Sequence, residues 1–146
     1  MHKRGRSITL RFIPHQLCET LELKRFGMKR DMELVRKILF FLEEQPMLKA
    51  QTVVPIEGYE KEVIMYHMLL LAQAGLVDFE PEKTENGRII RAHVLGLNWA
   101  GHEFLDTVRS EKVWKKLVQY AAKRGGALPF DLLKVLGAEL LKRSIE

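Results

Sequence analysis

Histidine and cysteine are the side chains of this sequence that acid–base, metal or nucleophilic chemistry would use first. The five histidines stand at positions 2, 15, 67, 93 and 102. His102-Glu103 lacks the second histidine of a zinc-binding His-Glu-x-x-His helix, and the sequence contains no phosphate loop, nucleophile elbow or pair of catalytic carboxylates. Cys18, the single cysteine, has no evident base that would activate its thiol. The sequence therefore predicts neither an enzyme nor a metal or cofactor site.

Two of the histidines have structural interpretations. His67 falls on the apolar arc of a predicted helix, so we expect a buried, hydrogen-bonded side chain rather than a ligand or a base. His102 is expected to pack or hydrogen-bond near the start of its helix. The alternative, a joint functional role for Trp99, His102 and Asp106, stays open.

The basic side chains are concentrated at the two ends of the sequence, whose formal net charge is +5. Residues 1–27 carry six basic and two acidic side chains, residues 28–108 nine and thirteen, and residues 109–146 nine and four. Phosphate neutralisation supplies most non-specific affinity for DNA, so the ends are better candidates for such contacts than the acidic middle.

Two basic groups are candidates for contacts with a nucleic-acid backbone. Lys112, Lys115 and Lys116 share one face of a predicted helix, and further basic residues surround Trp114 and Tyr120 in the same region: Arg109, Lys123 and Arg124. The second group is Arg88, Arg91 and Lys83 in a predicted hairpin, where Glu80, Glu82 and Glu85 cancel their charge. The alternatives are the solvated side of an amphipathic helix and a solvated ribbon.

The elements that carry these groups follow from apolar spacing and from cap and turn residues. Asp31 opens a helix that Pro46 ends, Thr52–Val54 is a short β-prone piece, and a second helix spans about Tyr59 to Ala74 and is closed by Gly75. Two strands, Leu76–Glu80 and Arg88–Leu97, flank a tight turn at Asn86-Gly87, where both residues tolerate positive φ. Three further helices begin after Asn98, at Ser110 or Glu111, and at Pro129.

The helix at residues 60–74 has an unusual outer surface. Its core arc gathers these residues: Val63, Ile64, His67, Met68, Leu70, Leu71 and Ala74. The opposite arc presents Met65, Tyr66, Leu69 and Gln73 together with Glu62. A helix that lies in the major groove offers Arg, Lys, Asn or Gln to base edges, so an exposed apolar arc is better suited to a protein partner.

Several short sequence motifs together resemble the family catalogued as domain of unknown function 2513. They are Met28-Lys-Arg-Asp-Met32, Gly58-Tyr59, Tyr66-His67, Leu70-Leu71, Ala74-Gly75-Leu76, Leu97-Asn-Trp-Ala-Gly-His-Glu-Phe-Leu-Asp106 and Trp114. The resemblance covers about residues 28–143, and the run from Trp99 to Asp106 is its most distinctive part. It implies a winged-helix fold and a phage or mobile-element setting, and it brings no catalytic residues. Asn98 stands where Thr is expected, which keeps a capping side chain.

The predicted fold class is α+β, mainly α, with a small antiparallel hairpin as the wing of a winged-helix domain. Residues 28–108 form the predicted winged-helix core, and residues 109–146 form a C-terminal helical hairpin packed on it. Residues 1–27 are either a basic, poorly ordered extension or residues upstream of a natural start at Met28. No apolar run approaches the roughly 20 residues of a membrane span, and the single cysteine fits a reducing cytoplasm.

Two functions from different classes stay open. The first is an accessory or regulatory protein that associates with double-stranded DNA, with backbone contacts from these residues: Arg88, Arg91, Lys112, Lys115 and Lys116. The second is a protein-interaction or dimerisation module that does not bind DNA. Its interface would be formed by Met65, Tyr66, Leu69 and Gln73, or by the Leu132–Leu140 helix.

Overall fold

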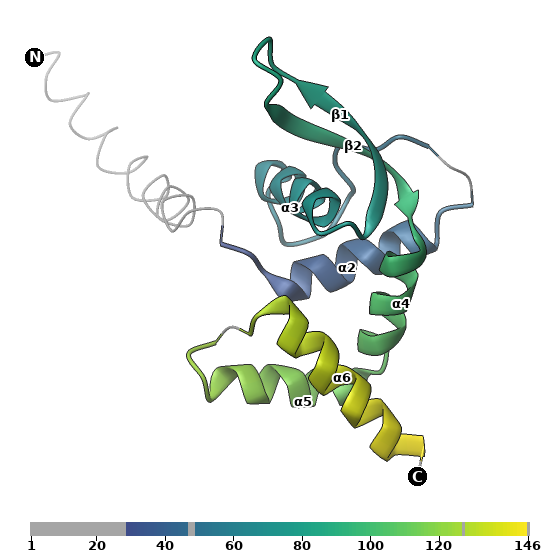
Figure 1. Cartoon of the computed structure of the whole chain (residues 1–146), viewed down its shortest axis with the longest axis vertical. Coiled ribbons are helices and arrows are strands. Elements are labelled where there is room, and N and C mark those ends of the chain that lie inside the picture. Colours follow the sequence, from purple (N-terminus) through teal and green to yellow (C-terminus); the bar gives the residue numbers. More distant parts are fainter. Residues whose placement is uncertain (1–28, 47–48, 127, 146) are drawn as a thin grey trace, which may run out of the picture. The chain divides into compact units, whose positions relative to one another are not determined.

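The computed structural model describes residues 29–46, 49–126 and 128–145, and the predicted N-terminal extension lies outside these ranges. Residues from Asp31 onward form one compact unit. Its elements are α2 (Met32–Glu43), α3 (Lys61–Gln73), β1 (Val77–Lys83), β2 (Ile89–Leu97), α4 (Trp99–Val108), α5 (Glu111–Ala122) and α6 (Phe130–Ile145), as Figure 1 shows. The part of the chain that the structure describes is therefore α+β and mainly helical, as the sequence predicts.

Helix α2 supplies much of the core. The Asp31 Oδ1 atom accepts the backbone N–H groups of Glu33 and Leu34 at 2.9 and 3.2 Å, so Asp31 is the N-cap. The helix buries these apolar residues: Leu34, Val35, Ile38, Leu39 and Leu42. It ends at Glu43, before Pro46. The predicted start, face and end of this helix are confirmed.

The hairpin is longer than predicted and turns differently. Val77 pairs with Leu97, and the antiparallel ladder extends through Pro81 to Lys83. At the turn, the Thr84 N–H donates to the Arg88 carbonyl and the Gly87 N–H to the Thr84 carbonyl, both at 2.9 Å. Gly87 has φ of +79°, but no non-glycine residue of the described chain has positive φ. The expectation that Asn86 also uses this region is therefore wrong, because the connection is a wider loop that needs one left-handed residue.

A single bridge joins the segment before α3 to the hairpin. The Gln51 N–H and carbonyl exchange hydrogen bonds of 2.8 Å with the backbone of Val94 in β2. The β-prone piece at Thr52–Val54 is not itself paired, although Val54 is almost fully buried. This stretch therefore contributes one bridge and a core side chain rather than a strand.

Helix α3 packs between α2 and the hairpin (Figure 1). Ile64, His67, Met68, Leu71 and Ala72 are its buried residues. Of the other residues on the predicted core arc, Val63 and Leu70 are half-buried and Ala74 is exposed. The buried face of α3 therefore differs slightly from the predicted core arc, because α3 contacts both α2 and the two strands of the hairpin. Gly75, with φ of +75°, ends the helix as predicted.

His67 joins α3 to the start of α2. Its side chain is fully buried; Nδ1 lies 2.8 Å from the Val63 carbonyl, and Nε2 lies 2.8 Å from the Asp31 N–H. Since the backbone N–H is always the donor, Nε2 accepts, and Nδ1 carries the proton that is donated to Val63. The prediction of a hydrogen-bonded interior histidine is confirmed.

Helix α4 starts at a close contact with the end of α3. Asn98 Oδ1 accepts the Gly101 N–H at 2.9 Å, and Asn98 Nδ2 donates to the Gly75 carbonyl at 2.7 Å. A Cβ atom at Gly101 would overlap the Leu76 carbonyl oxygen. Only glycine therefore allows the two backbones to approach this closely.

The last two helices pack on α4 and on each other. Ser110 caps α5, and Gly125 and Gly126, with φ of +91° and +89°, follow its end as the sequence predicts. In α6, Leu133 is buried, Leu136 and Leu140 are half-buried, and Leu132 is exposed. The leucines of α6 therefore differ in burial.

Replacing Gly101 with alanine tests the close approach of α4 to Leu76. Although alanine gains about 1 kcal/mol in helix propensity, we expect Gly101→Ala to lower the free energy of unfolding by about 2–3 kcal/mol, because backbone has to move. The matched control is Gly137→Ala, whose Cβ would meet the Thr107 Cγ2 methyl at 2.6 Å. A side chain yields more easily, so the loss should be smaller; equal losses in urea unfolding would contradict this account.

Tyr59 makes the stability of the fold depend on pH in the alkaline range. Its hydroxyl donates to Asp31 Oδ2 at 3.2 Å. Burial raises the pKa of Tyr59 to about 12, and the negative charge of Asp31 adds to the effect. The stabilisation is complete below the unfolded pKa of about 10 and is lost as the pH rises towards 12. Stability should therefore fall more steeply across this range in the wild type than in Tyr59→Phe, and tyrosinate absorbance should show one late titration that this variant lacks.

Candidate functional site

The outward face of α5 is the most basic helix face in the described part of the chain. Val113, Trp114 and Leu117 point into the core, so the opposite side of the helix faces solvent. That side carries these exposed residues: Lys112, Lys115, Lys116, Gln119 and Lys123. They span an arc of about 100° and about 16 Å along the helix axis. We call this set the lysine face.

The lysine face keeps its charge. None of its four lysines forms an ion pair with an acidic side chain of the described residues. Glu111, the acid in the first turn of α5, instead pairs with Arg36 at 3.1 Å. The surface is therefore a row of ammonium groups with one amide among them, which suits a polyanion.

Helix α5 is held in place by Trp114 and a buried arginine. The indole N–H of Trp114 donates to Glu33 Oε2. The Arg36 guanidinium lies over the Trp114 ring, 5.2 Å from its centre, and over Phe40 at 4.9 Å. Its Nε and Nη2 atoms donate to the carbonyls of Val108 and Arg109 at 2.8 and 3.0 Å. Arg36 is only 7% exposed, so the junction of α4 and α5 is tied to α2.

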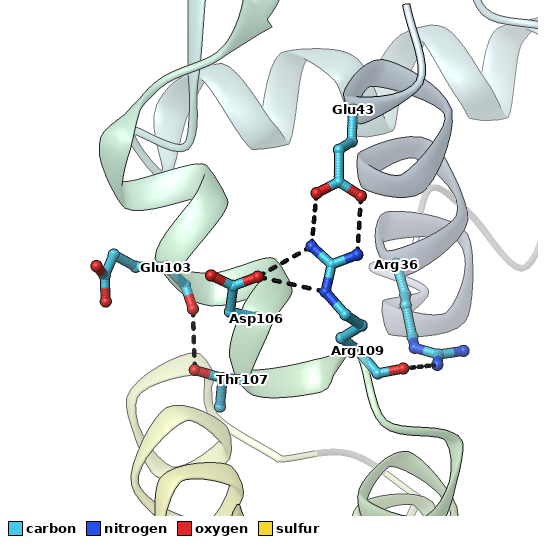
Figure 2. Close-up of polar contacts among 6 residues, drawn as sticks. All are labelled: Arg36, Glu43, Glu103, Asp106, Thr107 and Arg109. Carbon is cyan, nitrogen blue, oxygen red and sulfur yellow. Dashed lines mark hydrogen bonds and ion pairs between the residues drawn. The ribbon is translucent and has the colours of Figure 1, made fainter.

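Arg109 does not belong to the basic group in which the sequence places it. Its guanidinium forms a two-bond ion pair with Glu43 and also binds Asp106 Oδ1 at 2.9 Å, as Figure 2 shows. The hydrogen bonds with Glu43 and then Asp106 raise the pKa of Arg109, and the hydrogen bond from Arg109 lowers the pKa of Glu43. Because its charge is matched by two carboxylates, Arg109 is not available to a polyanion.

The aromatic residues of this region are placed differently from the prediction. Trp114 is 4% exposed, so no ligand reaches it. Tyr120 is half-buried, and the Arg124 guanidinium stacks over its ring 3.7 Å from the centre. The basic surface of α5 therefore consists of lysines without an exposed aromatic ring among them.

The hairpin brings basic and acidic groups together. Arg91 Nη1 lies 3.5 Å from Glu82 Oε1, and Glu82 Oε2 lies 3.1 Å from His93 Nε2. Thr52 Oγ1 binds the other ring nitrogen of His93. Arg88 and Lys83 are exposed near the turn. The predicted Arg88 and Arg91 thus lie on the same hairpin, but Arg91 is partly neutralised.

The outer arc of α3 is less open than the sequence suggests. Gln73 is exposed, but Met65, Tyr66 and Leu69 are half-buried, and Leu69 packs against the core. The Tyr66 ring meets His67 edge-on with centroids 5.8 Å apart. The predicted apolar stripe is therefore half-buried rather than fully exposed, and α3 contacts α2 as well as both strands of the hairpin.

Comparison with known proteins places the chain in a family. The family model described as "Hypothetical protein (DUF2513)" matches residues 29–127. The chain belongs to the DUF2513 family. A relative from Haemophilus influenzae, described as "Uncharacterized protein", is 29% identical over 119 residues, or 81% of this chain and 99% of that one. No solved structure gives a significant match.

The structure of the DUF2513 chain differs from the sequence-based prediction at Arg36 and at the start of α4. The sequence does not single out Arg36 as a structural link, although an arginine beside the apolar face of a helix, four residues before Phe40, is a local indication of such a role. Trp99 and His102 are both exposed at the start of α4, so His102 is not packed as expected, and Asp106 is engaged by Arg109. No group of three or more His, Cys, Asp or Glu side chains suited to a metal occurs among the described residues, and none of their helices has the length and apolarity to cross a membrane.

The contribution of Arg36 can be measured with Arg36→Met. This change leaves the Val108 and Arg109 carbonyls without their donor, so we expect a loss of roughly 2–4 kcal/mol in the free energy of unfolding. Lys37→Met is the matched control: it removes a neighbouring exposed charge whose ammonium lies 5.4 Å from the centre of the Tyr59 ring, and it should cost at most about 1 kcal/mol. Arg36→Lys should fall between them, since an ammonium cannot reproduce the fork geometry. Equal stability of the two methionine variants would contradict the structural role.

Proposed function

We propose that this DUF2513 protein is a non-enzymatic accessory or regulatory protein of the cytoplasm that associates with double-stranded DNA. The phage or mobile-element setting implied by the family resemblance is part of the proposal. The lysine face of α5 is the observation that carries it. Four exposed lysines on one rigid helix face, with no acid among them, form the kind of surface that neutralises backbone phosphates.

The dimensions of the lysine face suit a duplex backbone. Duplex DNA carries about one negative charge per 1.7 Å of its axis, and the face spans about 16 Å, so each lysine has a phosphate within reach. Trp114 and Arg36 fix the helix on the core. A fixed platform limits the loss of freedom on binding largely to the lysine side chains themselves.

The binding is expected to discriminate weakly between DNA sequences. Helix α3 exposes Lys61, Glu62 and Gln73 at its two ends and has half-buried Met65 and Tyr66 between them, so the middle of the helix offers few donors or acceptors for base edges. Phosphate contacts position a protein on DNA without reading sequence. Arg88 near the hairpin turn adds a backbone contact, and Arg91 contributes less because Glu82 lies beside it.

The winged-helix interpretation is part of the same proposal. The element order of helix, bridge, helix and hairpin supports it, as does the pairing of Gln51 with Val94, which adds a third short stretch of chain beside β2. The described chain departs from an ordinary helix-turn-helix in one respect, because the single helix α3 occupies the space between bridge and hairpin. Without a separate positioning helix, contacts with the DNA backbone would have to come from another element, and the lysine face of α5 is the one proposed here.

The proposal is tested by titrating the protein with duplex DNA at several salt concentrations. With four phosphate contacts, the logarithm of the association constant should fall with the logarithm of salt concentration at a slope of about −3.6. Changing Lys112, Lys115 and Lys116 together to glutamine should reduce the magnitude of that slope by about 2.7. The matched control changes Lys134, Lys142 and Arg143 of α6, which removes the same charge.

The outcomes separate the two classes of function. A larger loss of affinity in the α5 variant than in the α6 variant supports the lysine face as the contact. Equal losses would mean that total charge, not this face, controls binding. Absence of binding at low salt would contradict DNA association and leave the alternative, a protein-interaction or dimerisation module. That module would use the α3 residues Met65, Tyr66, Leu69 and Gln73, or α6.

A further inference from the structure

Trp99 is the most unusual surface residue of the described chain. It is 81% exposed, whereas the other tryptophan, Trp114, is 4% exposed. Other residues in the run from Trp99 to Asp106 have structural roles: Gly101 lies against Leu76, Phe104 and Leu105 are in the core, and Asp106 binds Arg109. A large aromatic ring in water is a common anchor of protein interfaces.

Acidic side chains share the helix face of Trp99. Glu103 and Asp106 follow it by four and seven residues, which places all three on one side of α4. Helical side chains lean towards the N-terminus, so the Glu103 carboxylate lies over the turn that carries Trp99. Both acids are exposed. Figure 2 shows the Glu103 side chain directed away from the Arg109 cluster. We call these three residues the α4 face.

The charge of the α4 face is negative. Two basic residues lie beside it: His102, which is exposed, and Arg109, which is already bound by Glu43 and by Asp106 Oδ1. Among the described residues, Glu103 makes no side-chain ion pair and Asp106 Oδ2 accepts no hydrogen bond. Trp99 lies in the first turn of α4, where the helix end carries about half a positive charge; this is less than the full negative charge of the Glu103 carboxylate one turn on. A cation that contacts Trp99 therefore finds unsatisfied carboxylate oxygens next to it.

We propose that the α4 face is a docking site for an arginine-bearing segment of a partner protein. The guanidinium stacks on the exposed Trp99 ring, and its N–H groups donate to the Glu103 carboxylate one turn further along the helix. Asp106, about 10 Å from Trp99 along the axis, adds negative charge to the face and does not contact the same guanidinium. Arginine fits better than lysine, because a planar guanidinium combines stacking on an aromatic ring with forked donation to carboxylates. The site is independent of DNA association, since it is acidic and does not include α5.

The test uses an N-acetylated, C-amidated Arg-Gly-Arg-Gly-Arg peptide and its citrulline analogue, which keeps the shape and removes the charge. Binding to the full-length protein is followed at low salt by calorimetry and by the emission of Trp99, since Trp114 is buried. The arginine peptide should bind and alter the emission, and the citrulline peptide should not. Trp99→Ala and Glu103→Gln should each weaken binding about 2–5-fold.

The matched control for charge is Glu85→Gln. Glu85 is an exposed acid in the hairpin turn, at the opposite end of β2 from Trp99 and roughly 25 Å away along the strand. This change should leave peptide affinity unaltered. Equal weakening in the Glu85 and Glu103 variants, or no change in Trp99 emission, would overturn the proposal. A fall in native particle mass on Trp99→Ala would overturn it in favour of a second copy of this chain as the occupant.

Discussion

The Arg36 guanidinium is the point at which the first and last parts of the described chain meet. It reaches from α2 to two carbonyls, one at the end of α4 and one between α4 and α5, and then to Glu111 and the Trp114 ring. The buried cation is tolerated because its Nε and Nη2 atoms donate to acceptors and the guanidinium plane lies over two aromatic rings. Because α4 and α5 are held in place in this way, the helix that carries the lysine face is fixed on the core. The same two helices form the surface on which α6 packs.

The same arrangement separates the charges of the molecule. Glu33 and Glu43 of the central segment, and Glu111 of α5, face basic or indole donors within the fold, so these acids are used for internal contacts. The lysines of α5 have no such partners among the described residues. The basic residues of the C-terminal segment therefore form one helix face on α5, while α4 begins with an exposed aromatic ring that is followed by two carboxylates.

Local signals predicted the helices well and long-range pairings poorly. The Asp31, Asn98 and Ser110 caps and the Gly75 end depend on neighbouring residues only, and all four appear in the structure. The burial of His67 follows from its position on an apolar arc. In contrast, Arg36 and Arg109 find partners 66 to 75 residues away, which no local pattern encodes. The half-burial of Met65 and Tyr66 depends on elements that cover a second side of α3.

Pro81 near the middle of β1 has a consequence for the behaviour of the protein in concentrated solution. Within the described residues, β1 pairs with β2 alone, so its outer rim offers backbone groups to any extended chain that approaches. Proline supplies no N–H at that rim, and charged residues occupy four of the seven positions of the strand. Such a rim disfavours edge-to-edge pairing with a strand of another molecule. The free edge of the hairpin is therefore a poor template for intermolecular strand addition.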